Sequence, residues 1–198
     1  MRNSRFALLL ALITGCSSSP ENQTMEELFE GSVEDLSSAG GFGGMSDDVQ
    51  GRQAERVDAA RRAWLQQKLA SAEDHLWCAA VLANSKDLED LVLAYKLALE
   101  ADRLGDRRGQ TLSAEIIDKE LLERGEPQRY GTQIVFDRFT RRYRMYDLDP
   151  ATTDAERRAV GLPSLEELMA RVGLAEREQG DPVRNGRRLL VDDPFSEH

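Results

Sequence analysis

The spacing of the apolar residues changes at Gly125, and this change constrains the fold more than any other feature of the chain. Before it, from about residue 52, apolar residues recur every three to four positions, which predicts amphipathic helices. After it, residues 132–136 and 142–146 alternate with a period of two, which predicts a β-hairpin near residues 131–148. We therefore expect a mainly α fold, a small helical bundle with one antiparallel helical hairpin unit and a single β-hairpin packed on the helices.

An uninterrupted apolar run, Leu76–Ala83, predicts a helix that is buried on every side and lies at the centre of the bundle. Two helices after it, joined at Leu104–Asp106, form the expected helical hairpin. Two short helices follow the β-hairpin and end near Gly161 and Gly173. The apolar residues that we expect to face inward on the other three helices of the bundle are Val57, Ala60, Trp64 and Leu65, then Leu88, Leu91, Val92, Tyr95 and Leu99, then Leu112, Ile116, Ile117 and Leu121.

The first fifteen residues have the pattern of a signal peptide. Arg2 and Arg5 precede an apolar run that is too short to span a bilayer. The next residues, Ile13-Thr14-Gly15-Cys16, resemble the lipobox of bacterial lipoproteins, which implies that Cys16 carries palmitate or related acyl chains; an ordinary secretory signal is the other interpretation. Ser17 follows the cysteine, and the usual sorting pattern of lipoproteins then points to the outer membrane, facing the periplasm.

The composition divides the rest of the chain into three parts. Residues 16–51 are rich in Ser, Gly, Asp and Glu, which predicts a lipidated cysteine followed by a flexible tether. Residues 52–172 form the expected domain. Residues 173–198 are polar, and we expect this tail to be mostly disordered.

Charge and residue inventory exclude several kinds of function. The net charge is -10, and removal of Arg2 and Arg5 with the signal leaves 24 basic and 36 acidic residues, or -12, which argues against nucleic-acid binding. The chain has two histidines, His75 and His198, which argues against a histidine-based catalytic triad and against a metal site built from several histidines. Cys78 lies in the apolar run and is expected to be a buried, inert residue. We expect no metal and no cofactor.

The candidate site is the junction Gly125–Gln133, where the helical half meets the predicted hairpin. The amides of Gln128 and Gln133 and the hydroxyl of Thr132 can satisfy backbone groups at this junction, with Tyr130 as a packing anchor. In the second interpretation, Gln128, Tyr130, Thr132 and Gln133 are binding residues of a polar pocket, and Asp118 is its charged member and candidate catalytic residue.

A basic stretch follows the junction. Arg129, Arg138, Arg141, Arg142 and Arg144 accompany one acid, Asp137, in a chain that is otherwise acidic. Arg141, Arg142 and Arg144 are therefore candidates for binding an anionic envelope polymer or phospholipid headgroups. The other interpretation is that these arginines pair with the acidic helices of the same chain.

The junction also resembles a family of uncharacterised bacterial proteins. Its hallmarks are Asp118-Lys119-Glu120-Leu121 followed by Gly125-x-Pro127-Gln128-x-Tyr130-Gly131-Thr132-Gln133, and the resemblance runs from about His75 to Val172. The family implies no established activity. Its members often carry histidines near the positions of Asn84 and Tyr95, which this chain lacks.

Taken together, these features favour a membrane-anchored envelope lipoprotein that acts as a binding or scaffold module for a protein or an anionic envelope partner. The alternative is an envelope enzyme of the hydrolase type that uses Asp118 with the Gln128/Thr132/Gln133 junction. This alternative requires Asp118, Gln128 and Gln133 to converge on an open, solvent-reachable pocket.

Overall fold

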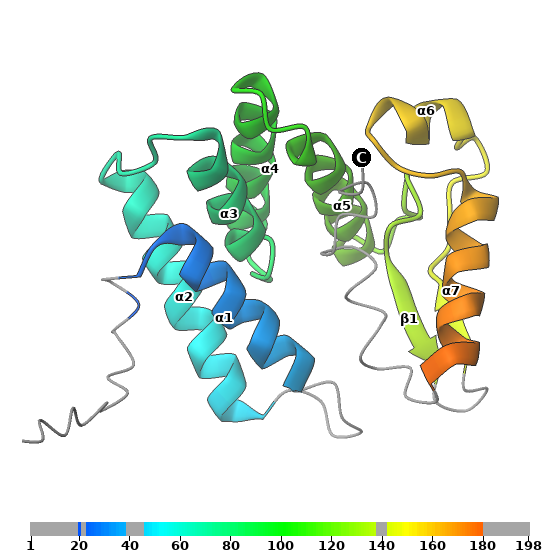
Figure 1. Ribbon diagram of the computed structural model, residues 1–198, viewed down its shortest axis with the longest axis horizontal. Helices are drawn as coiled ribbons and strands as arrows, with labels where there is room; N and C mark the ends of the chain where they lie inside the picture. Colours follow the sequence, from blue (N-terminus) through cyan, green and yellow to red (C-terminus); the bar gives the residue numbers. More distant parts are fainter. Residues whose placement is uncertain (1–19, 21–22, 39–45, 138–141, 180–198) are drawn as a thin grey trace, which may run out of the picture.

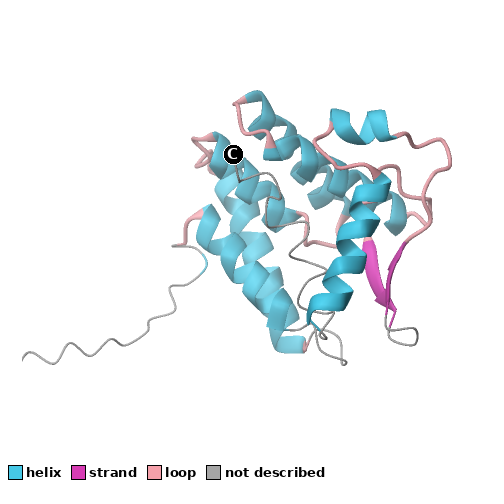
Figure 2. Cartoon of the chain, turned by 45° about the vertical axis from the view of Figure 1, so that its right-hand side comes forward, coloured by secondary structure: helices cyan, strands magenta, loops and turns pink. Residues whose placement is uncertain are grey.

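The computed structural model describes residues 20, 23–38, 46–137 and 142–179. In this part of the chain, helices predominate and one two-stranded antiparallel hairpin lies at an edge (Figures 1 and 2). The predicted mainly α fold is therefore confirmed. The signal segment with Cys16, the turn of the β-hairpin with Arg138 and Arg141, and the tail beyond residue 179 lie outside the described residues.

Five helices form the N-terminal part: α1 (Met25–Ser38), α2 (Asp47–Leu65), α3 (Ala72–Leu82), α4 (Leu88–Arg103) and α5 (Arg108–Glu123). Helix α3 contacts the other four, and its residues Cys78, Ala79, Val81 and Leu82 are completely buried. It begins at a capping box between Ser71 and Asp74. The apolar run thus forms the central helix, as predicted.

The flexible tether predicted for residues 16–51 is wrong for Met25–Ser38 and for the start of α2. Helix α1 places Leu28, which has no exposed surface, in the main core and stacks Phe29 on Trp77 with ring centroids 4.7 Å apart. The carboxylate of Asp35 accepts hydrogen bonds from Arg52 at 2.7 Å and Arg56 at 2.5 Å on α2. Helix α1 is polar in overall composition but has a narrow apolar face that packs in the core. The folded domain therefore begins well before residue 52.

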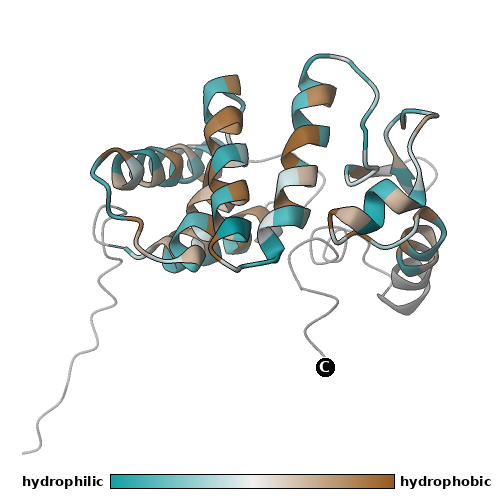
Figure 3. Ribbon diagram, turned by 90° about the horizontal axis from the view of Figure 1, so that it is seen from above, coloured by the Kyte–Doolittle hydropathy of each residue, from teal (hydrophilic) through white to brown (hydrophobic). Residues whose placement is uncertain are grey.

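Helices α4 and α5 form the predicted helical hairpin, but α4 is rotated from its expected orientation. Its buried face contains Leu91, Leu97 and the small residues Ala94, Ala98 and Ala101, which let α3 and α5 approach closely. Apolar and polar residues alternate in bands along the helices in Figure 3. The large residues that we expected inside but that are exposed are Leu88, Val92 and Leu99 on α4 and Trp64 and Leu65 on α2.

The C-terminal part contains strands β1 (Ile134–Asp137) and β2 (Arg142–Met145) and helices α6 (Asp154–Ala159) and α7 (Leu165–Gln179). The strands pair antiparallel with Ile134 opposite Met145. Tyr143 packs with Leu168 and Val172 of α7, so the hairpin buries one face against a helix as expected. Helix α7 continues past Gly173 to Gln179, which corrects the predicted start of the disordered tail.

Candidate functional site

Asp118 lies on α5 and holds the junction in place. One carboxylate oxygen accepts hydrogen bonds from the backbone amides of Arg129 and Tyr130, both at 2.7 Å. The other accepts from the backbone amide and the hydroxyl of Thr132, both at 2.8 Å. The side chain of Asp118 has no exposed surface, and these four hydrogen bonds bind the loop after α5 to the helix that precedes it.

Gln128 is equally buried and joins the junction to the hairpin. Its amide nitrogen donates to the carbonyl oxygens of Gln133 at 3.2 Å and Tyr146 at 2.9 Å, and its oxygen accepts from the backbone amide of Gln133 at 2.8 Å. The side chain of Gln133 donates to the carbonyl oxygen of Glu115 at 3.2 Å. Both glutamines therefore satisfy backbone groups where helix meets strand.

The backbone of the junction requires glycine at position 131. Gly131 has a φ of 71°, in the left-handed region. A Cβ atom there would lie 3.0 Å from a terminal nitrogen of Arg157 and 3.1 Å from the sulfur of Met145. Tyr130 is buried beside Ala114 and Leu162 and anchors the loop on α5.

This geometry does not meet the requirement of the hydrolase alternative. Asp118 and Gln128 are enclosed, and their hydrogen-bonding capacity is directed at the chain itself. The junction is instead a rigid structural connection between α5 and the hairpin. Of the five predicted site residues here, Thr132 and Gln133 also reach the lining of the groove described below.

The predicted basic surface is described only in part. Arg141 lies outside the described residues, as does the side chain of Arg142, and Arg144 is exposed. Arg129 lies 3.5 Å from Glu156 and over the ring of Tyr130. Arg129 thus pairs within the chain, and binding by Arg141, Arg142 and Arg144 stays a prediction.

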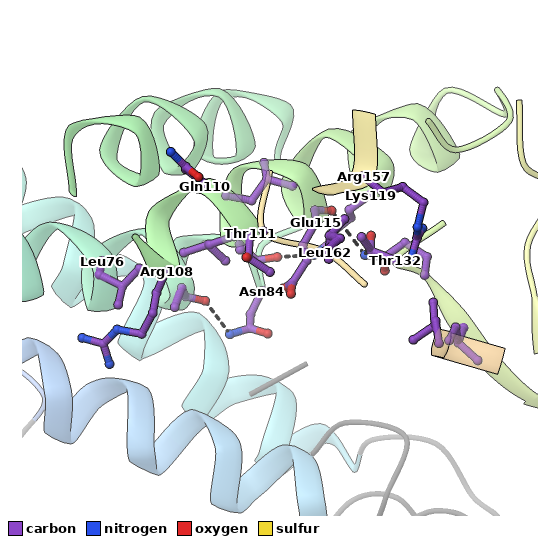
Figure 4. A pocket seen from close by; sticks show the side chains of 18 of the residues that line it. Leu76, Asn84, Arg108, Gln110, Thr111, Glu115, Lys119, Thr132, Arg157 and Leu162 are labelled. Carbon is purple, nitrogen blue, oxygen red and sulfur yellow. Dashed lines mark hydrogen bonds between the residues drawn. The ribbon is translucent and has the colours of Figure 1, made fainter. Parts of the chain in front are cut away.

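A groove of about 1170 Å³ lies between the N-terminal helices and the C-terminal part. Helices α1, α3 and α5 supply an apolar wall, and the junction, β1, α6 and α7 supply the opposite wall. Figure 4 shows polar residues from both walls along it. The apolar wall contains Phe29, Val33, Leu36, Leu76, Trp77, Ala80, Leu112, Ile116 and Leu122.

One charged residue of the groove, Glu115, was missed by the sequence analysis. It lies on the groove face of α5, between Asn84 and Thr132 in the view of Figure 4. Its side chain is half-buried in the wall of the groove. This burial and the negative charge of Asp118 raise its pKa to about 8. The sequence feature that could have identified Glu115 is its place, as an acidic residue, among the apolar residues of a helix face.

Two cationic side chains that line the groove donate hydrogen bonds to backbone carbonyl oxygens of its walls. The ammonium group of Lys119 donates to the carbonyl oxygens of Ala83 and Ser85 and so caps the C-terminal end of α3. Arg157 on α6 is 1 % exposed, and its Nε donates to the carbonyl oxygen of Pro163 at 2.9 Å. Burial lowers the pKa of Arg157, while Asp154 and Asp118 oppose this shift.

The described residues give little support to metal binding, to cysteine chemistry or to a membrane-spanning helix. They contain no group of three His, Cys, Asp or Glu side chains placed to hold a metal ion. Cys78 has no exposed surface, and burial raises the pKa of its thiol to about 12, as expected for an inert core residue. Within the same ranges, no helix combines the length and apolar character that crossing a bilayer requires.

Comparisons with protein-family models, with curated proteins and with solved structures find no match to this chain. The resemblance to an uncharacterised bacterial family therefore stays a prediction. Asn84, where that resemblance implies a histidine in other members, lines the groove.

Proposed function

We propose that this protein is a lipid-anchored module of the bacterial cell envelope that binds a polypeptide segment of a partner protein in the groove. The groove carries the proposal, because a large apolar cleft with a few polar groups is the usual form of a binding site. A wall built from three helices suits an amphipathic segment laid along it.

The charge of the groove favours an acidic segment. Five cationic residues line it against two acidic ones, Glu115 and Glu123, in a chain whose net charge is -10. Such a local excess of positive charge attracts acidic segments of a partner. The cations are Arg107, Arg108, Lys119, Arg157 and Arg171.

The anchor is proposed from the lipobox-like sequence that ends at Cys16. Acyl chains on Cys16 would hold the module at the membrane, because each buried methylene contributes about 0.8 kcal/mol. Labelling of cells with radioactive palmitate should mark the wild-type protein and leave a Cys16→Ser variant unlabelled. Labelling of both proteins would refute the anchor at this residue.

Site-specific photocrosslinking in cells tests the binding groove. A photoreactive phenylalanine analogue placed at Ala80 should yield a discrete adduct whose partner mass spectrometry identifies, since Ala80 lines the groove. The same analogue at Val92, an exposed apolar position on α4, is the matched control and should yield no such adduct. Equal adducts at both positions, or none at Ala80, would count against the groove.

A further inference from the structure

Glu115 is the acidic residue of the groove whose side chain has no assigned task. It has no hydrogen bond and no ion pair with any of the residues that the structure describes, although its backbone oxygen accepts from Gln133. Asp118, one turn further along α5, is saturated by four hydrogen bonds from the junction. The carboxyl group of Glu115 is thus available to a ligand, whereas that of Asp118 is not.

The cations of the groove do not neutralise Glu115 by direct pairing. The ammonium group of Lys119, one turn away on α5, donates to carbonyl oxygens of the α3 end. Arg108 pairs with Asp106 at 2.6 Å and lies over the ring of Trp77. The charged and titratable side chains that line the groove with Glu115 are Arg107, Arg108, Lys119 and Glu123 near or on α5, Tyr146 after β2, Arg157 on α6 and Arg171 on α7.

We propose that Glu115 selects the ligand of this groove through its proton: the neutral carboxyl group donates a hydrogen bond to a carboxylate or carbonyl oxygen of the bound acidic segment, and deprotonation abolishes this contact. The inference rests on the proposed binding groove and adds the chemical group that the ligand presents at this position. A neutral carboxyl group both donates and accepts, whereas a carboxylate only accepts and repels an anionic ligand.

The direction of the pH effect follows from the surroundings of Glu115. Burial and the charge of Asp118 raise its pKa to about 8, so the carboxyl group is largely protonated at neutral pH. A ligand that binds only the protonated form loses affinity as the pH rises through this value. At one pH unit above the pKa, about a tenth of the protein remains protonated, so affinity falls by about tenfold.

The groove can be titrated with 8-anilinonaphthalene-1-sulfonate, a probe with apolar rings and an anionic group. Energy transfer from Trp77, which lines the groove, reports binding in the full-length chain when the exposed Trp64 is replaced by phenylalanine. We expect the dissociation constant to rise by about tenfold between pH 6.5 and pH 9. In Glu115→Gln, whose amide keeps a donor and cannot ionise, it should stay constant over this range.

Glu123→Gln is the matched control, because it removes the other acid of the groove and should keep the wild-type pH profile. Probe binding with the same pH profile in wild type and Glu115→Gln would overturn the role of Glu115 and leave the groove intact. Ala80→Glu places a charge in the apolar wall and should abolish energy transfer. Undiminished transfer in this variant would overturn the groove and the inference together.

Discussion

Replacing Asp118 by asparagine tests whether this residue is the structural centre of the junction. Asparagine has nearly the same shape, so the packing around α5 is preserved. One carboxylate oxygen remains as an amide oxygen and keeps its two backbone donors, Arg129 and Tyr130. The other is replaced by an NH₂ group that faces the backbone amide and hydroxyl of Thr132, which are themselves donors.

The size of the loss follows from these four contacts. A hydrogen bond to a charged group contributes about 1.5–3 kcal/mol, and a buried group left unpaired costs about 1–3 kcal/mol. The variant loses two such hydrogen bonds, leaves the Thr132 amide unpaired and removes a negative charge that stabilises buried Arg157. We therefore expect its free energy of unfolding to fall by about 3–5 kcal/mol, a large part of the total of about 5–15 kcal/mol typical of a domain.

Urea denaturation followed by circular dichroism at 222 nm measures this change. Thr132→Val is the matched control, because it removes the hydroxyl contact and keeps the backbone amide, and should lose only about 1–2 kcal/mol. A loss below about 1 kcal/mol in Asp118→Asn would refute the structural role. The carboxylate would then be free for another task, as the hydrolase alternative requires.

Three further changes test other parts of the fold. Glu115 keeps its proton up to pH about 8 in the native state but loses it near pH 4.5 when unfolded, so the free energy of unfolding falls as pH rises between these values. By urea denaturation, Glu115→Gln should be about 4 kcal/mol more stable than wild type at pH 8, with the difference nearly gone at pH 4.5. In a Cys16→Ser chain, Cys78 should react with Ellman's reagent at pH 8 only upon unfolding, because its thiol is buried. Leu28→Ala should cost about 2–4 kcal/mol by the same denaturation assay, whereas an equal stability would restore the predicted tether.

The sequence predicted those helices and strands that are determined by residues close together in the chain. Capping boxes begin α3 at Ser71 and α6 at Thr153. In each, the hydroxyl accepts from the backbone amide three residues later, and the acid at that position accepts from the backbone amide of the capping residue. The alternation after Gly125 gives the observed strands, because side chains of a strand point to opposite faces in turn. The amide-rich junction likewise follows the structural interpretation, in which polar side chains satisfy backbone groups.

The incorrect predictions concern residues whose burial depends on how the helices pack together. Hydrophobicity favoured Leu88 and Val92 as the inner face of α4, yet Ala94 and Ala98 lie inside because close helix packing requires small side chains. Helix α1 has only a few apolar residues on its buried face, so the composition of this segment is dominated by its polar residues and predicted a tether. Glu115 was missed because its setting depends on two walls that are distant in sequence.

Adjacent residues on α5 fasten both walls of the groove. Lys119 is bonded to the end of α3, and Asp118 is bonded to the loop that leads into the hairpin. An outward movement of either wall at these points would break these hydrogen bonds, which favours a groove that is preorganised before any ligand arrives. A partner then loses little affinity to rearrangement of this protein, and the backbone of the free and bound forms should agree within about 1 Å. Selectivity in such a site comes from rejecting segments that do not fit.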